Sequence, residues 1–349
     1  MSILLKTQRR TQGILLAIAA LVPMAHGVMA PRVNTIPSRT SVVTLLLALG
    51  AGAAYGQDFP IKPIRIVTSA PGGSSDFTSR LIAQGLTDAL GQPVVVDNRG
   101  NFGGEQLAKA PPDGYTLIVD GASLWIGPLI QKTSYDPLRD FAPVTIAVSA
   151  PNVIVVHPSL PVKSVKDLIA LAKARPGELN YGSGGIGGAS HLPAELFKSM
   201  AGINIVNVNY KGTGAAVNAL LAGEIQMMFA NAAISTPHIK SGRLRGVAAA
   251  SLQPSPLLPD LPTVAASGLP GFESIILQGV LTAGNTPAAR ITRLNQEIVR
   301  ALNRPDVKER HFNTGVETVG STPETLAATM RSDIVKWGKV IKDAGIKNQ

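Results

Sequence analysis

Two short stretches of the sequence combine glycines with small hydroxyl residues in a way that suits the binding of an anion. The first loop is residues 69–76, "SAPGGSSD", and the second loop is residues 180–191, "NYGSGGIGGASH". Each lies between a predicted strand and a predicted helix. At the first turn of such a helix, backbone N–H groups lack helical partners, and the positive end of the helix dipole attracts negative charge.

The residue types in these loops add to this chemistry. Glycine allows a ligand to approach the backbone closely, and the hydroxyls of Ser74, Ser75 and Ser183 can donate further hydrogen bonds. For one such loop alone, an ordinary turn with Ser74 or Ser75 as the N-cap explains the pattern equally well. Two such loops in one chain favour ligand binding. His191 is a candidate donor to the anion, and the alternative is that it only caps or packs there.

The second loop also satisfies the dinucleotide-binding pattern G-x-G-x-x-G, from Gly182 to Gly187. A dinucleotide site requires an acidic residue at the end of the next strand, roughly 20 positions further on, to hold the ribose. The next predicted strand ends instead in Asn209, Tyr210 and Lys211. Neither loop matches the phosphate-binding pattern G-x-x-x-x-G-K-[ST]. The sequence therefore favours a carboxylate over a nucleotide.

No arrangement of residues indicates catalysis. The histidines beyond residue 56 belong to no H-E-x-x-H pattern, and no G-x-S-x-G nucleophile elbow occurs. The chain has no cysteine, which excludes disulfides, thiolate metal sites and thiol catalysis. We therefore predict a binding protein that is not an enzyme and holds no cofactor or metal. Trp125 and Tyr181 are candidate walls of the cleft, although large aromatic residues more often lie in the core.

The elements that position the two loops alternate between short apolar strands and helix-length segments. The first group of strands is predicted at residues 64–70, 93–99 and 115–121, and the pattern restarts with a strand at 151–158. A proline-rich segment, 252–273, interrupts it before a last strand and three helical segments. The prediction is an α/β fold of two lobes, each a mainly parallel sheet with helices on both faces. The expected lobes are residues 57–157 plus 281–349 and residues 158–280, with the ligand cleft between them.

Residues 1–56 contain five of the 32 basic residues, none of the 22 acidic residues and two apolar runs, which is typical of an export signal. The apolar run at 41–54 suits cleavage before Gln57, and translation is then expected to start at Met24 or Met29. The alternative is a membrane anchor at residues 13–30, which is marginally long for a span. Without residues 1–56 the formal net charge falls from +10 to +5, a mildly basic balance that suits an anionic small ligand. An aromatic content of 4% does not support nucleic-acid binding.

Several long motifs resemble the Bug-type, TctC-like solute-binding proteins of tripartite tricarboxylate transport systems. They include "PIKPIRIVTSAPGGSSDFTSRLIAQGL", "LNYGSGGIGGASHLPAELFKSMAGI" and "YKGTGAAVNALLAGEIQMMF". The resemblance implies a type II periplasmic binding protein fold, in which two lobes close on a small organic acid or amino acid. It implies a periplasmic protein, exported with a cleaved signal peptide, that delivers its ligand to membrane permease subunits. A signalling receptor is the alternative partner, and we expect a monomer.

The resemblance also assigns the ligand site. Its residues are Ala70, Pro71, Gly72, Gly73, Ser74, Ser75 and Asp76 in the first loop, Ser183, Gly184, Gly185, Ile186, Gly187, Gly188 and His191 in the second, and Ala122, Ser123, Tyr210 and Lys211 at the cleft edges. Ser69 stands where the family usually has an aromatic residue, Ala230 stands where it frequently has an Asp, and the glycine-rich segment at 100–110 is shortened. These departures concern the identity of the ligand rather than the fold.

Overall fold

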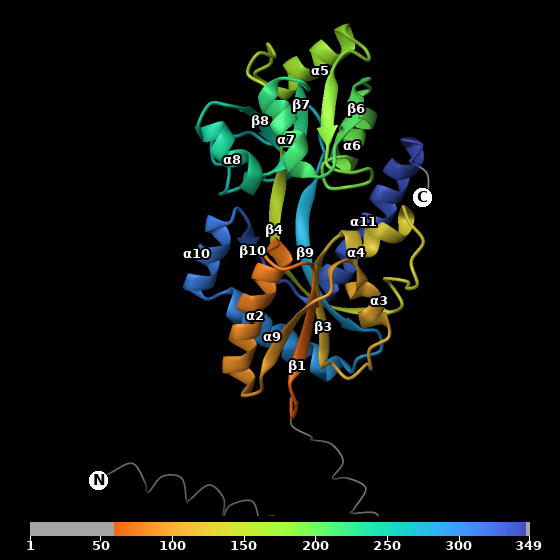
Figure 1. The fold of residues 1–349 in the computed structure, drawn as a ribbon, viewed down its shortest axis with the longest axis vertical. Helices are drawn as coiled ribbons and strands as arrows, with labels where there is room; N and C mark the ends of the chain where they lie inside the picture. Colours follow the sequence, from red (N-terminus) through yellow and green to blue (C-terminus); the bar gives the residue numbers. More distant parts are fainter. Residues whose placement is uncertain (1–58, 347–349) are drawn as a thin grey trace, which may run out of the picture. The chain divides into compact units, whose positions relative to one another are not determined.

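The computed structural model describes residues 59–346 of the chain. The expected export signal, the alternative membrane anchor and the expected start sites lie outside the described residues. Within residues 59–346, no helix has the length and apolar character needed to cross a membrane. The described part of the chain is an α/β fold built on one continuous set of paired strands (Figure 1).

The first lobe is a sheet in the order β2-β1-β3-β9-β4. Its strands are β1 (Ile64–Thr68), β2 (Val94–Asn98), β3 (Thr116–Gly121), β4 (Phe141–Val156), β9 (Ile275–Ala283) and the short β10 (Glu317–Thr318), which pairs with β4. Apolar side chains of α2 (Ser74–Leu90), α9 (Ala288–Leu302) and α10 (Pro305–Asn313) bury one face. Those of α3 (Gly103–Ala108), α4 (Ser123–Ile126) and α11 (Pro323–Asp343) bury the other. The 3-10 turns η1 (Gly100–Phe102) and η2 (Gly127–Leu129) flank α3 and α4.

The second lobe continues from β4 through β7 (Met227–Asn231) and β5 (Asn180–Ser183) to β6 (Val206–Asn209). The remaining strand, β8 (Arg245–Ala249), also pairs with β4. Helices α5 (Val165–Ala174) and α6 (Leu192–Ala201) cover one face, and α7 (Thr213–Ala222) and α8 (Ala232–Lys240) cover the other.

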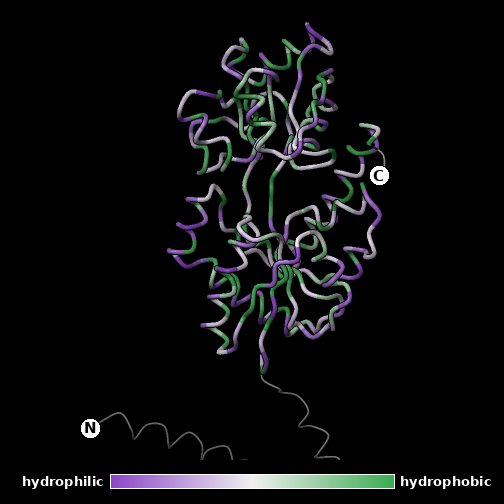
Figure 2. Tube along the Cα trace, in the orientation of Figure 1, coloured by the Kyte–Doolittle hydropathy of each residue, from purple (hydrophilic) through white to green (hydrophobic). Residues whose placement is uncertain are grey.

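Double burial explains the continuous apolar run in a central strand such as β7. In β7, Met227 and Phe229 pack with α5 and α6, whereas Met228 and Ala230 pack with α7 and α8. Successive side chains of a strand point to opposite faces, so a strand covered on both faces needs no polar residue in its sequence. Figure 2 shows the resulting concentration of hydrophobic residues along the strands. The prediction of helices on both faces is confirmed.

The sheets are mixed, because β4 and β9 run antiparallel to their neighbours. β4 begins at Phe141, ten residues before the strand that the sequence predicts at 151. Pro143 lies near its start, and shifts in register follow at Pro143/Thr145 and Ile146/Val148. These irregularities break the two-residue alternation by which a strand is recognised, and they hide the first ten residues of β4.

Strands β4 and β9 lie side by side where they connect the two lobes (Figure 1). β4 pairs with β9 as far as Pro151 and Ile275, and with β7 from Asn152 onward. The expected lobe boundaries fall just after the end of β4 and inside β9. That division of the chain stays a prediction, because β4 takes part in the sheets of both lobes.

Buried His311 in α10 gives the fold a specific sensitivity to acid. Its Nδ1 lies 2.9 Å from the carbonyl oxygen of Val307, and its Nε2 lies 3.3 Å from the hydroxyl of Thr78. Burial lowers the pKa of His311, so the unfolded chain binds a proton more readily than the folded protein does. His311 therefore does not reduce the free energy of unfolding above about pH 6.5, the pKa of a histidine in the unfolded chain. As the pH falls below about 6.5, the unfolded chain takes up a proton at His311 and the free energy of unfolding decreases.

We expect the urea midpoint of unfolding to fall between about pH 7.5 and pH 5, and the variant His311→Gln to show a smaller fall. Replacing the half-exposed His238 by Gln is the matched control and should leave the pH dependence unchanged. The same pH dependence in His311→Gln as in the natural protein would assign the effect to another group.

Candidate ligand-binding cleft

The first loop leaves the carboxyl end of β1 and leads into α2. Residues 70–74 are exposed, whereas Ser75 and Asp76 are buried. Gly73 is the N-cap residue of α2, with φ −78° and ψ 168°, and no side chain caps this helix end. Phe77 makes the first helical hydrogen bond, to the carbonyl oxygen of Gly73 at 3.0 Å. The N–H groups of residues 74–76 therefore have no acceptor within the helix and can bind an anion.

Asp76 holds the first loop in place. Its Oδ2 accepts hydrogen bonds from the N–H of Gly72 at 3.0 Å and from Nε of Arg80 at 3.1 Å. Its Oδ1 accepts one from Nδ2 of Asn98 at 3.0 Å. Arg80 foremost, with Asn98 and Gly72, lowers the pKa of Asp76 to about 2. Both carboxylate oxygens of Asp76 thus accept hydrogen bonds from within the protein. Its predicted contact with the ligand stays a prediction.

The second loop is also held by a hydrogen bond from a glycine N–H to a side chain. The N–H of Gly187 donates to Nδ1 of His191, four residues further on, at 3.0 Å. Since Nδ1 is the acceptor, the proton of the neutral ring is on Nε2, which lies 4.0 Å from Oε1 of Glu195. His191 is buried, and burial lowers its pKa, so the ring is neutral near pH 7. Nothing tests the predicted ligand contact of His191.

Glu195, Tyr181 and Lys198 form a buried cluster beside His191. The hydroxyl of Tyr181 donates to Oε1 of Glu195, and Nζ of Lys198 lies 2.8 Å from the same oxygen. Burial and Glu195 raise the pKa of Tyr181. Tyr181 is fully buried, as is Trp125, whose Nε1 donates to Oδ2 of Asp333 at 3.0 Å. Both aromatic residues are core residues, and the interpretation of them as cleft walls is wrong.

The second loop lies against the start of α7. The N–H of Tyr210 donates to the carbonyl oxygen of Ser183 at 2.8 Å, and that of Gly212 donates to the carbonyl oxygen of Gly184 at 3.2 Å. A Cβ on Gly184 would lie 2.4 Å from the backbone nitrogen of Thr213, so only glycine allows this approach. The structure thus brings the second loop together with Tyr210 and the exposed Lys211.

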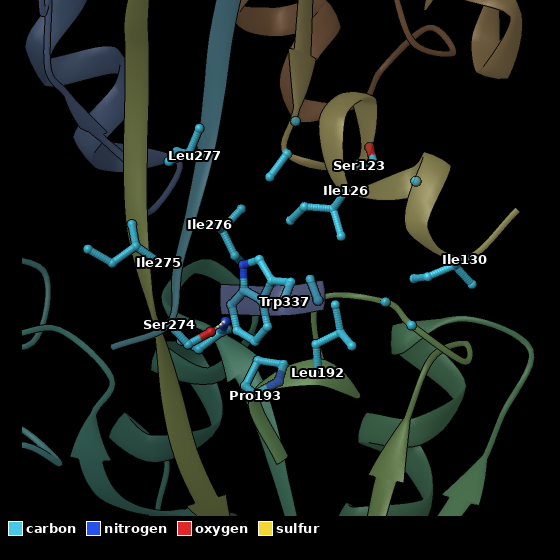
Figure 3. A pocket seen from close by; sticks show the side chains of 17 residues that line it. Ser123, Ile126, Ile130, Leu192, Pro193, Ser274, Ile275, Ile276, Leu277 and Trp337 are labelled. Carbon is cyan, nitrogen blue, oxygen red and sulfur yellow. Dashed lines mark hydrogen bonds between the residues drawn. The ribbon is translucent and has the colours of Figure 1, made fainter. Parts of the chain in front are cut away.

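A cavity of about 230 Å³ lies between elements of the two lobes. Four predicted site residues line it: Ala122, Ser123, Gly187 and Gly188. The largest side chains in its wall are Ile126, Ile130, Leu192, Pro193, Ile275, Ile276, Leu277 and Trp337 (Figure 3). The other predicted site residues, in 70–76 and 183–186 and at 191, 210 and 211, do not line this cavity.

Gln278 connects the cavity wall to the first loop. It pairs in register with Gly121 of the wall, and its Nε2 donates to Oγ of Ser74 at 2.7 Å. Its Oε1 is buried and has no hydrogen-bond partner within residues 59–346. The first loop therefore lies against strand β9, the strand whose residues Ile275, Ile276 and Leu277 line the cavity.

Sequence reasoning missed four residues of this region: Gln278, Asn152, Ser274 and Trp337. A lone polar residue in an apolar strand was the available signal for Gln278 in "IILQGVLTA" and for Asn152 in "PNVIVV". Nδ2 of Asn152 donates to Oγ of Ser274 at 2.9 Å, where β4 passes from one lobe to the other. No group of His, Asp or Glu side chains within residues 59–346 is arranged to hold a metal ion.

Two α/β lobes joined by a pair of long strands, with a small-molecule cavity between their elements, define a solute-binding protein. The family described as "Tripartite tricarboxylate transporter family receptor" matches residues 78–346, and the chain belongs to this family. Protein BugT of Bordetella pertussis is 36% identical over 317 residues, which are 88% of this chain and 97% of BugT. The predicted family is therefore confirmed, and its members are substrate-binding receptors rather than enzymes.

Two solved structures support the same conclusion. The protein Rpa4515 of R. palustris, solved with adipate, has a TM-score of 0.69 and 35% identity, covering 84% of this chain and all of that one (100%). The periplasmic binding protein BugD has a TM-score of 0.67 and 32% identity, with coverage of 83% and 100%. The predicted two-lobed binding-protein fold is confirmed.

Asp76→Asn tests how the first loop is held. A pKa lowered to about 2 means that Asp76 stabilises the folded state fully above about pH 4, and that this stabilisation is lost as the pH falls through about 2. Near neutral pH we expect Asp76→Asn to lower the free energy of unfolding by about 1–2 kcal/mol. Between about pH 4 and pH 2, the variant should depend less on pH than the natural protein.

Asp88→Asn on the same helix is the matched control, because the carboxylate of Asp88 is largely exposed, 3.9 Å from Arg304. It should change the free energy of unfolding by less than about 0.5 kcal/mol. Equal losses in the two variants, measured by urea unfolding, would show that Asp76 has no special part in holding the loop.

Proposed function

We propose that this protein captures a small carboxylate between its lobes in the periplasm and delivers it to the membrane subunits of a tripartite tricarboxylate-type transporter. The observation that carries the proposal is the amino end of α2, which no side chain caps and which a glycine loop presents in an exposed position. The adipate of Rpa4515 supports it, because adipate is a carboxylate bound by a relative of the same fold.

The first loop supplies the donors for the carboxylate. The N–H groups of Ser74 and Ser75 begin the helix, and the helix dipole adds a favourable field for a negative charge. Oγ of Ser74 accepts a hydrogen bond from Gln278, so its own hydroxyl hydrogen is free to be donated to the ligand. Gly72 and Gly73 carry no side chain that would obstruct the approach.

The second loop, with Tyr210 and Lys211, supplies the opposite side of the site. Lys211 adds a positive charge, and Gly185 leaves open space, since no atom lies within 4 Å of a Cβ placed on it. A ligand that contacts both lobes at once stabilises their closed arrangement. Bending of β4 and β9, the strands shared by the lobes, would provide the hinge.

The direct test is a thermal-shift panel on the full chain, with mono-, di- and tricarboxylates and the corresponding amides. A ligand that binds only the folded state stabilises it by about 2.7 kcal/mol at one hundred times its dissociation constant. We expect a shift with at least one acid and none with its amide. A panel without any shift, from protein shown to be folded by circular dichroism, would refute carboxylate binding.

Gly73→Asp tests the site at the amino end of α2. The backbone of Gly73 suits an N-cap, and a Cβ there would meet the carbonyl oxygen of Ala70 at 3.4 Å, an ordinary contact. An aspartate would cap α2 with its own carboxylate and occupy the donors meant for the ligand. We expect carboxylate affinity to fall by at least about 100-fold without a loss of stability, because the variant exchanges one acceptor at the helix end for another.

Gly73→Ala is the matched control, since it adds the Cβ without the charge, and it should keep affinity within about 10-fold. In the second loop, φ of +156° strains Gly185→Asp and Gly185→Ala alike, so the lower affinity expected of the Asp variant relative to the Ala variant reports the repulsion of the ligand's charge. Isothermal titration of all four variants decides the assignment. Unchanged affinity in Gly73→Asp or in Gly185→Asp would remove that loop from the site.

A further inference from the structure

The wall of the 230 Å³ cavity is apolar on the sides contributed by both lobes. Ile126 and Ile130 come from α4 and the turn after it, Leu192 and Pro193 come from the start of α6, and Trp337 comes from α11 (Figure 3). None of the described residues that line it is ionisable. Whatever part of a ligand enters this cavity meets hydrocarbon and an indole ring rather than a countercharge.

Several polar groups of the wall already have hydrogen-bond partners within the described residues. Asn152 donates to Ser274, the N–H of Gly187 donates to His191, and the N–H of Gly188 donates to the carbonyl oxygen of Gly185. Lys336 lies over the ring of Trp337, 4.7 Å from its centroid, and pairs with Asp333 at 3.7 Å. A carboxylate buried in this cavity would therefore lose its hydration without gaining a cation.

The size of the cavity suits a compact apolar group. An apolar cavity of about 150 Å³ in another protein accommodates benzene. A cavity of about 230 Å³ therefore has room for a six-membered ring with one or two further carbon atoms, or for a folded aliphatic chain of similar volume. Two uncharged polar side-chain groups of the described wall, the hydroxyl of Ser123 and Nε1–H of Trp337, have no hydrogen-bond partner within residues 59–346.

We propose that the ligand is a monocarboxylate with an apolar body, whose carboxylate binds at the amino end of α2 while the body fills the cavity against Trp337. The inference rests on the proposed function, because it takes the carboxylate site from it. Gln278 makes the geometry possible, since it joins Ser74 of the first loop to the strand that forms one side of the cavity. Charge is recognised at the loop, and the shape of the body is recognised in the cavity.

Matched pairs of acids test this on the full chain. 4-Methylbenzoate and terephthalate share a ring and differ by a methyl group in place of a second carboxylate, and hexanoate and adipate differ in the same way along a six-carbon chain. We expect the monocarboxylate of each pair to bind at least about 100-fold more tightly, because the second carboxylate would lie unpaired in the cavity. A change in tryptophan fluorescence on binding that Trp337→Phe abolishes would report contact with Trp337, because Trp125 is the other tryptophan of the chain.

The outcomes separate this inference from the proposed function. Tighter binding of the dicarboxylate in either pair would overturn the apolar assignment and leave carboxylate capture standing. Binding of 4-methylbenzamide as tightly as 4-methylbenzoate would remove the carboxylate site and with it the proposed function. Binding of none of these four acids by folded protein that responds to another acid of the wider panel would overturn the apolar assignment alone, and no response to any acid of that panel would overturn both.

Ile130→Arg places a cation in the cavity wall at a half-buried position. We expect it to raise the affinity for terephthalate relative to 4-methylbenzoate by at least about 10-fold, because the second carboxylate gains a bidentate partner. Val335→Arg adds the same charge at an exposed position on α11 outside the wall and should leave the ratio unchanged. Ile126→Arg is the second variant should Ile130→Arg fail to fold. An unchanged ratio in a folded variant of Ile130 or Ile126 would show that the body of the ligand lies elsewhere.

Discussion

The antiparallel pairing of β4 with β9 is the constraint on which the rest of the structure depends. The two strands stay paired, with two shifts of register, from Phe141 and Ala283 to Pro151 and Ile275, and β4 then continues into the second lobe. They supply the last strands of the first sheet, the first strand of the second sheet and one side of the cavity. Because both sheets grow from one pair of strands, bending of that pair moves one lobe against the other without breaking either core.

Both glycine loops are held in shape by the same kind of hydrogen bond, from a glycine N–H to a side chain. A loop that offers free N–H groups to a ligand has few internal hydrogen bonds to define its shape. In each loop, a glycine with positive φ, Gly72 at +80° or Gly187 at +73°, directs its N–H to the side chain four residues further on. Asp76 and His191 are those side chains, and both are buried. The loops are thereby ordered before any ligand arrives, which lowers the entropic cost of binding.

The sequence predicts the strands and helices of this protein well. It predicts poorly which residues from distant parts of the chain come together in the cleft. Strand and helix positions follow from apolar runs and caps, as at Ser164, whose Oγ accepts the N–H of Asp167 as the N-cap of α5. The direction of a side chain does not follow from its position in the sequence, so the hydrogen bonds by which Asp76 and His191 hold their own loops are visible only in the structure. Trp337 lies more than 140 residues beyond the second loop, and only the packing of α11 brings it to the cavity.

The two parts of the cleft respond differently to change in the sequence. At the first loop the donors are largely backbone N–H groups, which survive most substitutions as long as the glycines and the holding side chain remain. The cavity is formed by side chains, so single substitutions at Ile126, Ile130 or Leu192 change its volume and polarity. Relatives can therefore retain one way of binding a carboxylate while taking ligands of different size and charge. If the first loop binds a carboxylate as proposed, the apolar wall around Trp337 is the part of the cleft that selects the body of the ligand.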